Sequence, residues 1–373
     1  MKISLVETFP LYYPLKQPYG DANGYKQYRS CFLIRITTQS GLSGWGECTD
    51  WLPALMVGFE KQIIPFLLGK KALDQAQLVQ YIKKWHLRSA SAVSMALTEI
   101  AANFSGLSIC DLWGGKFRSE IPVYASFQSY TEQADWVGQS LALVQNALAE
   151  GFNHVKLKVG GKTFPQDYNH IKKIYTLLSE NQQLILDANQ SYDVATALKW
   201  NQLFADWDKV LWFEEPLPLN QVENYRLLRS KLSTPVAGGE NLKSSIDFLP
   251  MLQGNALDII QPDPAHQGGI EEYRHTLDLA RTFGIRISPH TFDGALSKLY
   301  AVFAQACLPP WSKMSENDIE PVEWDVMENP FAALLPLKPT RGKLAVPTGV
   351  GIGMELDYQI IKHYRLDQQS VLG

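Results

Sequence analysis

From residue 121 onward the chain repeats one pattern, a short apolar segment followed by a longer amphipathic one. Short apolar runs predict buried strands, and amphipathic segments at helical spacing predict helices. Strands are expected over residues 123–127, 153–159, 183–188, 210–214, 235–239, 257–262, 285–289 and 321–325. Helices fit between them, for example over residues 135–150, 165–180 and 269–283. Eight strands that alternate with helices every ~25–35 residues predict a closed (β/α)8 barrel. An open doubly wound sheet would need a glycine-rich phosphate turn after its first strand, and the sequence has none there.

The two ends of the chain do not follow this repeat. Residues 31–37 predict a strand of a β-rich opening, and residues 90–112 predict one long packed helix. After about residue 327 the sequence returns to short strands and turns, and we expect this tail to rejoin the first module. The expected division is an α+β module, a barrel and a completing tail, over residues 1–118, 119–326 and 327–373.

Composition narrows the classes of partner. The 34 basic and 38 acidic residues give a net charge of −4. Because there is no excess of basic residues, nucleic acid is not an expected partner. No apolar run approaches the ~20 residues that span a bilayer, and no apolar core marks a signal peptide at the N-terminus. The four cysteines are scattered without a CxxC motif, which is typical of reduced thiols. We expect a soluble cytoplasmic protein.

Charged residues lie on four neighbouring strands at the ends where barrel enzymes carry their chemistry. Lys156 and Lys158 lie two residues apart on the second strand, so both point to the same face. Asp187, Glu214 and Glu240 end the third, fourth and fifth strands after apolar runs. Buried carboxylates are costly unless they are neutralised. An all-oxygen set without paired His or Cys favours a hard cation, and Mg²⁺ is the natural choice because it keeps sites for substrate oxygens.

The charge sum of this cluster indicates an anionic substrate. Three carboxylates and one Mg²⁺ give −1, and the two lysines make the total positive. Such a site suits a substrate that chelates the ion through a carboxylate oxygen. A lysine beside a cation and another lysine should lose its proton more easily, which makes Lys158 a candidate base.

The remaining strands end in a second set of polar residues. Asp263 ends the sixth strand and His290 the seventh, so the acid could fix the tautomer of the imidazole. Glu323 on the eighth strand could donate a hydrogen bond to a developing oxyanion if it stays protonated, although a surface position is nearly as compatible with the sequence. His154 and His266 are weaker candidates, expected to pack or to lie in loops.

These motifs in this order resemble the enolase superfamily, and within it the mandelate racemase subgroup. The similarity runs over nearly the whole chain and includes WGE at 45–47, KxK at 156–158, DAN at 187–189, EEP at 214–216, GGEN at 238–241, QPD at 261–263 and SPH at 288–290. From Lys158 to Asp187, Glu214, Glu240, Asp263 and His290 the successive spacings are 29, 27, 26, 23 and 27 residues. The muconate-lactonizing subgroup is a poorer match, because its members carry a lysine where this chain reads PDPAH at 262–266.

The resemblance implies a capping domain, completed by the C-terminal tail, over a (β/α)7β barrel. It implies that Mg²⁺ is held by three carboxylates, with Lys158 and the His290–Asp263 dyad as bases on opposite faces. Lys156 and Glu323 would bind substrate and help to stabilise the intermediate, and Asn189 would contact substrate. A homo-oligomer is also expected. The metal ligands implied are Asp187, Glu214 and Glu240.

The activity we expect is dehydration of a hydroxylated carboxylate, such as an aldonate or aldarate, to a 2-keto-3-deoxy acid. A racemase, an epimerase or a lactone cycloisomerase is the alternative. A Schiff-base aldolase that uses Lys158 and a non-catalytic sugar-acid-binding module are rivals from other classes. The cap loops at residues 17–26 and 49–59 show no diagnostic residue, so the substrate and its stereochemistry stay open.

Overall fold

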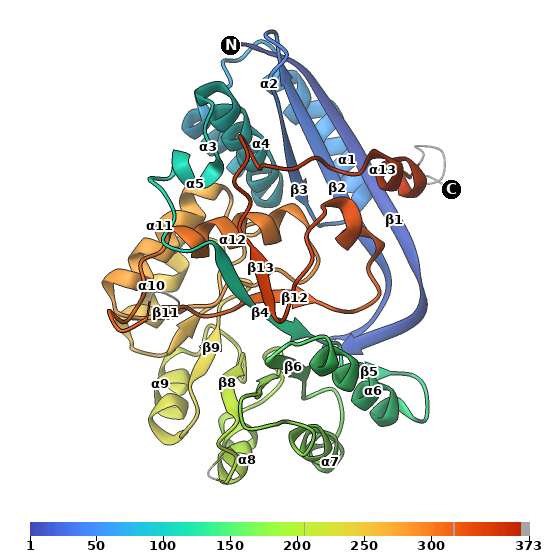
Figure 1. Ribbon diagram of the computed structural model, residues 1–373, viewed down its shortest axis with the longest axis vertical. Helices are drawn as coiled ribbons and strands as arrows, with labels where there is room; N and C mark the ends of the chain where they lie inside the picture. The colour runs from blue at the N-terminus through green and yellow to red at the C-terminus, as the bar shows by residue number, and fades with distance from the viewer. Residues whose placement is uncertain (205, 316–317, 367–373) are drawn as a thin grey trace.

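The computed structural model describes residues 1–204, 206–315 and 318–366. Figure 1 shows two parts, a long antiparallel sheet with helices at the N-terminal end and a curled parallel sheet surrounded by helices. The orange-red C-terminal segment runs from the barrel back across the first part.

The parallel sheet has the eight strands predicted from the sequence, although several are shorter. In barrel order they are β4 (Glu120–Ser126), β6 (His154–Lys158), β7 (Gln183–Asp187), β8 (Val210–Glu214), β9 (Val236–Gly238), β10 (Ile259–Ile260), β11 (Arg286–Ile287) and β12 (Val322–Asp325). Each strand pairs in parallel with the next from β4 to β11, and β12 pairs with β4. The two edges meet where Glu323 N donates to Pro289 O at 3.4 Å and Ser288 Oγ donates to Pro321 O at 2.7 Å. Both contacts draw the curled sheet toward closure.

An α-helix of the outer layer follows each of the first seven strands of the parallel sheet, which is the (β/α)7β arrangement. These helices are α6 (Trp136–Ala149), α7 (Phe164–Tyr175), α8 (Val194–Phe204), α9 (Val222–Lys231), α10 (Ser245–Gln253), α11 (Ile270–Thr282) and α12 (Leu296–Cys307). Alternate strand residues face the helices and the interior. Leu157 packs into the large apolar cluster, whereas Lys156, next to it, points inward over the Tyr124 ring at 5.4 Å. An apolar plug below the barrel mouth is formed by Tyr124, Ile185, Trp212, Ala237 and Ile259.

The first part of the chain forms the capping module. Its sheet runs in the order β3 (Ser43–Cys48), β2 (Gly24–Thr38), β1 (Ile3–Asp21) and β5 (Tyr130–Thr131), so a short strand from the barrel region extends the cap sheet. Its helices are α1 (Leu52–Gly58), η1 (Phe59–Ile63), α2 (Ile64–Leu67), α3 (Gln75–Lys83), α4 (Leu87–Ser105) and α5 (Ile109–Leu112). The prediction of one helix over residues 90–112 was wrong, because Gly106 adopts φ 66° and ends α4.

The tail contacts both parts. β13 (Lys343–Ala345) pairs antiparallel with β4, and Gly351 exchanges backbone hydrogen bonds with Leu107 and Ile109 of the cap. Further on, η2 (Pro330–Leu334) and α13 (Tyr358–Tyr364) pack together, and α13 contacts β1. The last part of the expected completing segment, residues 367–373, lies outside the described residues. Within the described ranges, no helix is long and apolar enough to cross a membrane.

Candidate active site

Strand register brings the predicted residues to one height at the barrel mouth. Lys158 pairs with Asp187 between β6 and β7, and Asp187 pairs with Glu214 between β7 and β8. Glu240 follows two residues after β9, which pairs with β8 in turn. A parallel sheet without slips at its carboxyl edge therefore places residues about 27 positions apart in sequence side by side.

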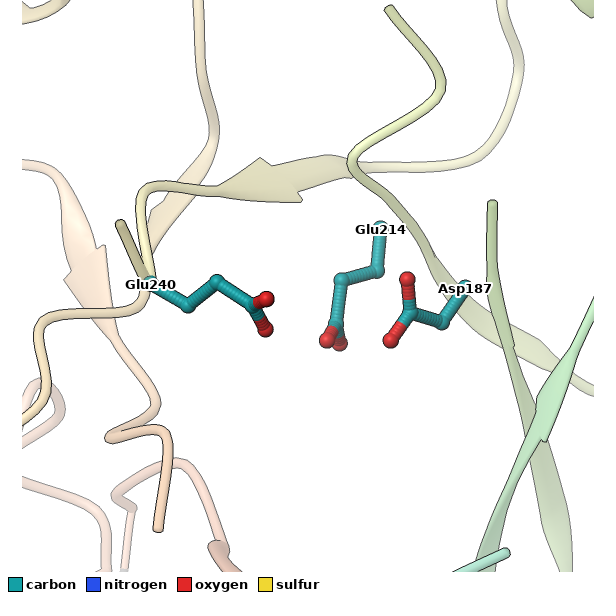
Figure 2. Close-up of side chains that lie close together, drawn as sticks. All are labelled: Asp187, Glu214 and Glu240. Atoms are coloured by element: carbon teal, nitrogen blue, oxygen red, sulfur yellow. The ribbon is translucent and has the colours of Figure 1, made fainter. Parts of the chain in front are cut away.

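Three carboxylates form the centre of the site. One oxygen from each of Asp187, Glu214 and Glu240 lies within 4.8 Å of the others, and Figure 2 shows Glu214 between the other two. Glu214 accepts hydrogen bonds from Gln261 Nε2 at 2.7 Å and Trp212 Nε1 at 3.0 Å. Burial, reinforced by the Asp187 charge, raises the pKa of Glu214 to about 7. Like charges this close favour a shared cation, and the donor set is all oxygen, so the cluster can hold a metal ion.

Two lysines lie on the β6 side of the carboxylates. Lys158 Nζ is 2.5 Å from Asp187 Oδ2, and its backbone N donates to Ser129 Oγ at 2.7 Å. Lys156 Nζ is 2.6 Å from Glu214 and 2.9 Å from Glu323. Burial works against the ammonium of Lys158, but the Asp187 carboxylate outweighs it and raises the pKa of Lys158. The expectation of an easily deprotonated lysine is therefore not met in this arrangement, because its nearest charge is a carboxylate.

His290 lies on the opposite side, in a dyad. Its Nδ1 is 2.7 Å from Asp263 Oδ2, and its Nε2 faces Glu240 at 3.3 Å and Glu323 at 3.5 Å. Burial disfavours the imidazolium, yet Glu240 and Glu323 outweigh burial and raise the pKa of His290 to about 10. Asp263 thus fixes Nδ1, and Nε2 points toward the carboxylates.

Glu323 is fully buried, so the reading of it as a surface residue was wrong. It accepts hydrogen bonds from Ser126 Oγ at 2.6 Å and from Thr291 N at 3.0 Å. Burial raises its pKa, but the charges of Lys156 and His290 reverse the effect and lower the pKa of Glu323 to about 2. A lowered pKa favours the ionised form, which accepts hydrogen bonds and donates none, so the donor role of Glu323 stays a prediction.

Asn189 lies at the same edge and adopts a left-handed backbone. Its N donates to Asp187 Oδ1 at 2.9 Å, and its buried Oδ1 has no hydrogen-bond partner among the described residues. Gln190 and Glu215 also have positive φ, at 64° and 37° beside the 43° of Asn189. Non-glycine residues in this region concentrate at functional sites, where the surrounding structure holds them in place.

Comparisons with known proteins identify the family. Residues 139–360 match the family model described as enolase C-terminal domain-like. Residues 6–114 match the N-terminal domain model of mandelate racemase and muconate lactonizing enzyme. The chain belongs to the mandelate racemase and muconate lactonizing enzyme family of the enolase superfamily. The two matches cover most of the cap and the barrel from α6 onward.

Relatives in the family have several activities. The chain is 29% identical to D-galactarolactone cycloisomerase from Agrobacterium fabrum, over 98% of this chain and 99% of the relative. It is 28% identical to L-talarate/galactarate dehydratase from Salmonella typhimurium, over 73% of this chain and 64% of the relative. The crystal structure of 3,6-anhydro-D-galactonate cycloisomerase from Zobellia galactanivorans superposes with a TM-score of 0.85 at 26% identity, covering 98% of this chain and 100% of that one.

Residues of the site that sequence reasoning left without a role include Gln261, Trp212 and Glu215. Gln261 and Trp212 orient Glu214, as described above. Glu215 accepts from Gln190 Nε2 at 2.8 Å and Gly239 N at 3.1 Å, and burial followed by the Glu240 charge raises its pKa to about 8. Glu215 lies in the EEP motif and Gln261 in the QPD motif, and these motifs were the sequence signal that could have identified them.

The two weaker histidine candidates lie where the sequence placed them. His154 packs inside the fold, where burial lowers its pKa to about 4. The His266 ring stacks on His290 with centroids 6.1 Å apart, and its Nδ1 is 2.9 Å from Glu240 O. His266 therefore supports the dyad from the loop that follows β10.

The predicted cap loop at residues 17–26 is the end of a hairpin formed by β1 and β2, and its Lys26 reaches the barrel. Its Nζ lies 2.8 Å from Asp293, so it is engaged by a barrel carboxylate. The second predicted cap loop, residues 49–59, is instead mostly the helix α1. This segment begins beside a small cavity of about 120 Å³ that Thr49, Arg88, His266 and His290 help to line.

Proposed function

We propose that this protein abstracts the α-proton of a hydroxylated carboxylate, a sugar acid, and then eliminates the β-hydroxyl as water to give a 2-keto-3-deoxy acid. The observation that carries the proposal is the arrangement of two bases around the carboxylate triad. Lys158 contacts Asp187 on one side, and His290 Nε2 faces Glu240 on the other. A planar intermediate bound between them can exchange protons on either face.

The triad fits Mg²⁺, since three carboxylate oxygens and the remaining positions for water or substrate oxygens match its preference. Asp187, Glu214 and Glu240 would hold the ion. When bound, it would supply positive charge to a substrate carboxylate and draw off the Asp187 charge that keeps Lys158 protonated.

The chain's own residues provide the rest of the mechanism. Neutral Lys158 Nζ takes the α-proton, and the Lys156 ammonium donates to the carboxylate oxygen on which negative charge develops. His290, held by Asp263 through Nδ1, delivers a proton from Nε2 to the departing β-oxygen. Lys156, Lys158 and Asp263 are buried and His290 is only 14% exposed, which limits the access of bulk water to these transfers.

A cycloisomerase is the second candidate, and the relatives favour it. Two proteins matched over nearly their full length are named as cycloisomerases of a sugar lactone and of an anhydro sugar acid. The same proton abstraction and β-elimination would open a ring whenever the departing oxygen belongs to it. The two candidates differ in substrate and in the release of water, and they use the same residues.

Two rivals from other classes fit the site less well. A Schiff-base aldolase needs a neutral lysine without help from a cation, whereas Asp187 raises the pKa of Lys158. A module that only binds sugar acids would not need two proton-transfer groups, Lys158 and His290, on opposite sides of the site.

The test is a screen of sugar acids, lactones and anhydro acids in D₂O with Mg²⁺, followed by NMR and by semicarbazide detection of keto acids. From at least one compound we expect a keto-acid product that carries deuterium at C3, the former β-carbon, and deuterium at the α-carbon of recovered substrate. EDTA should abolish both. Product formation that survives EDTA, together with borohydride reduction of a covalent imine between Lys158 and the substrate, would instead establish the aldolase.

A further inference from the structure

The loop that carries His290 is held by two charged residues of the cap. Residues 291–295 lead from His290 into α12, and they pack beneath β2 and β3. Glu47 on β3 and Arg29 on β2 contact this loop or the helix start, and each is only 1% exposed. Burying a charged side chain this deeply is costly unless specific partners compensate it.

Glu47 closes the N-terminus of α12 from a different part of the chain. The helix begins after Ala295, which provides no side-chain cap. Glu47 accepts instead from Ala295 N at 3.1 Å and from Ser297 N and Oγ at 3.0 Å each. The first N–H groups of a helix lack partners within the helix, and their positive end favours a carboxylate.

The loop is shaped to admit this carboxylate. Gly294 lies between His290 and the helix, and a side chain at that position would collide with Glu47 and with Ser297. The absence of a side chain at 294 and the carboxylate at 47 are therefore complementary features of one contact.

Arg29 holds the same loop from its other side. Its guanidinium bonds to Asp293, and its Nη2 lies 2.8 Å from Asp325. Asp293 follows His290 by three residues, and Asp325 follows Glu323 by two. Arg29 thereby joins the segments that carry two residues of the site.

We propose that Glu47 and Arg29 are positioning residues that fix His290 relative to the carboxylate triad, which makes the cap part of the acid/base machinery. The geometric part stands on these contacts, and its consequence for turnover rests on the proposed function. A proton donor must lie within hydrogen-bond reach of its target, and a displacement of about 1 Å can cost about 10²-fold in rate. Lys158, held by the strand ladder and Ser129, should be insensitive to the same contacts.

The first test is independent of any substrate. NMR of protein labelled with ¹⁵N-histidine follows the Nδ1–H of His290 in its bond to Asp263, assigned by its loss in His290→Asn. We expect its exchange with solvent to be about tenfold faster or more in Glu47→Ala, and less accelerated in Glu47→Gln, which keeps one acceptor oxygen.

Glu99→Gln is the matched control. Glu99 is another buried cap carboxylate that accepts from a backbone N–H, that of Trp45 at 2.7 Å, but this contact lies within the cap. In Glu99→Gln, the solvent exchange rate of the His290 Nδ1–H should equal that of the wild type. Unchanged exchange in Glu47→Ala, or equal acceleration in the control, would overturn the proposal. Should Glu47→Ala not fold, Ser297→Ala, which removes one of the three contacts, must shift exchange in the same direction.

The second test uses whichever sugar acid the wild type turns over. In Glu47→Ala, kcat for the keto acid should fall about 10²-fold with KM nearly unchanged, while α-hydrogen exchange through Lys158 falls less. Equal losses in both steps would contradict a role specific to His290. If the wild type turns over no compound in the screen, the proposed function fails, and the histidine NMR still decides the geometric claim.

Discussion

The two sides of the site are built differently. Lys158 is the last residue of a five-residue strand that is paired in register with β7. His290 lies beyond a strand of only two residues and depends on Asp263 for its orientation. Sheet hydrogen bonds hold Lys158, and side-chain contacts from distant parts of the sequence hold the segment that carries His290. The lysine side should therefore tolerate changes outside the barrel, and the histidine side should not.

Removal of the cation should have the largest effect, because both sides depend on it. EDTA should abolish α-hydrogen exchange and product formation together, and Mg²⁺ should restore both. Mg²⁺ at about 100 times its Kd should also stabilise the folded wild type by about 2.7 kcal/mol. In thermal melts, Glu214→Ala should lose most of this shift and Glu99→Gln should keep it. Equal shifts in both variants would place the ion elsewhere.

Substitutions of Lys158 and His290, the two proposed bases, should have different effects on α-hydrogen exchange and on product formation. Lys158→Met should reduce exchange of an α-hydrogen that faces the lysine, and turnover with it, by about 10²–10⁴-fold. His290→Asn should reduce product formation by a comparable factor and leave that exchange measurable. The checks are ¹H NMR in D₂O and keto-acid formation on the same samples. Full turnover by His290→Asn would remove the histidine from the mechanism.

Asp263→Asn should have a smaller effect, confined to the histidine side. The variant keeps the size of the side chain but weakens the bond to Nδ1, which is 2.7 Å long. Loss of an orienting partner of this kind costs about 10–100-fold. Steady-state kinetics should show this loss in kcat, with exchange through Lys158 near the wild-type rate. A parallel loss of exchange would show that the two sides are not independent.

The smallest effect on activity is expected at His170, which lies on α7, the helix that follows the strand of Lys158. Protonation of His170 in acid should lower the stability of the fold and leave turnover nearly unchanged. Burial lowers the pKa of His170 to about 4, and the ring bonds to Ser140 Oγ at 2.8 Å. Since the folded pKa lies below the unfolded value of about 6.5, stability is retained above pH 6.5 and is lost as pH falls toward 4, by up to about 3 kcal/mol. Urea unfolding at several pH values should show this slope, and His170→Gln should flatten it with little change in kcat at pH 7.5. An unchanged slope would mean that His170 does not contribute.

The sequence was sufficient to predict the barrel and the meeting of residues such as Lys158, Asp187 and Glu214, because strand period and repeat length determine which residues reach the mouth. It could not predict the break at Gly106, where a single left-handed residue overrides the helical pattern. It also could not predict the lowered pKa of Glu323, which depends on charges brought close by the tertiary fold. The contact between Glu47 and α12 spans some 250 residues, and no local pattern encodes it.

The most direct test of the account is a crystal structure grown with Mn²⁺ in place of Mg²⁺, with anomalous data to locate the ion. The account predicts one strong peak about 2.0–2.3 Å from an oxygen of each of Asp187, Glu214 and Glu240, between Lys158 and His290. A peak elsewhere, or no peak with the three carboxylates turned apart, would contradict it.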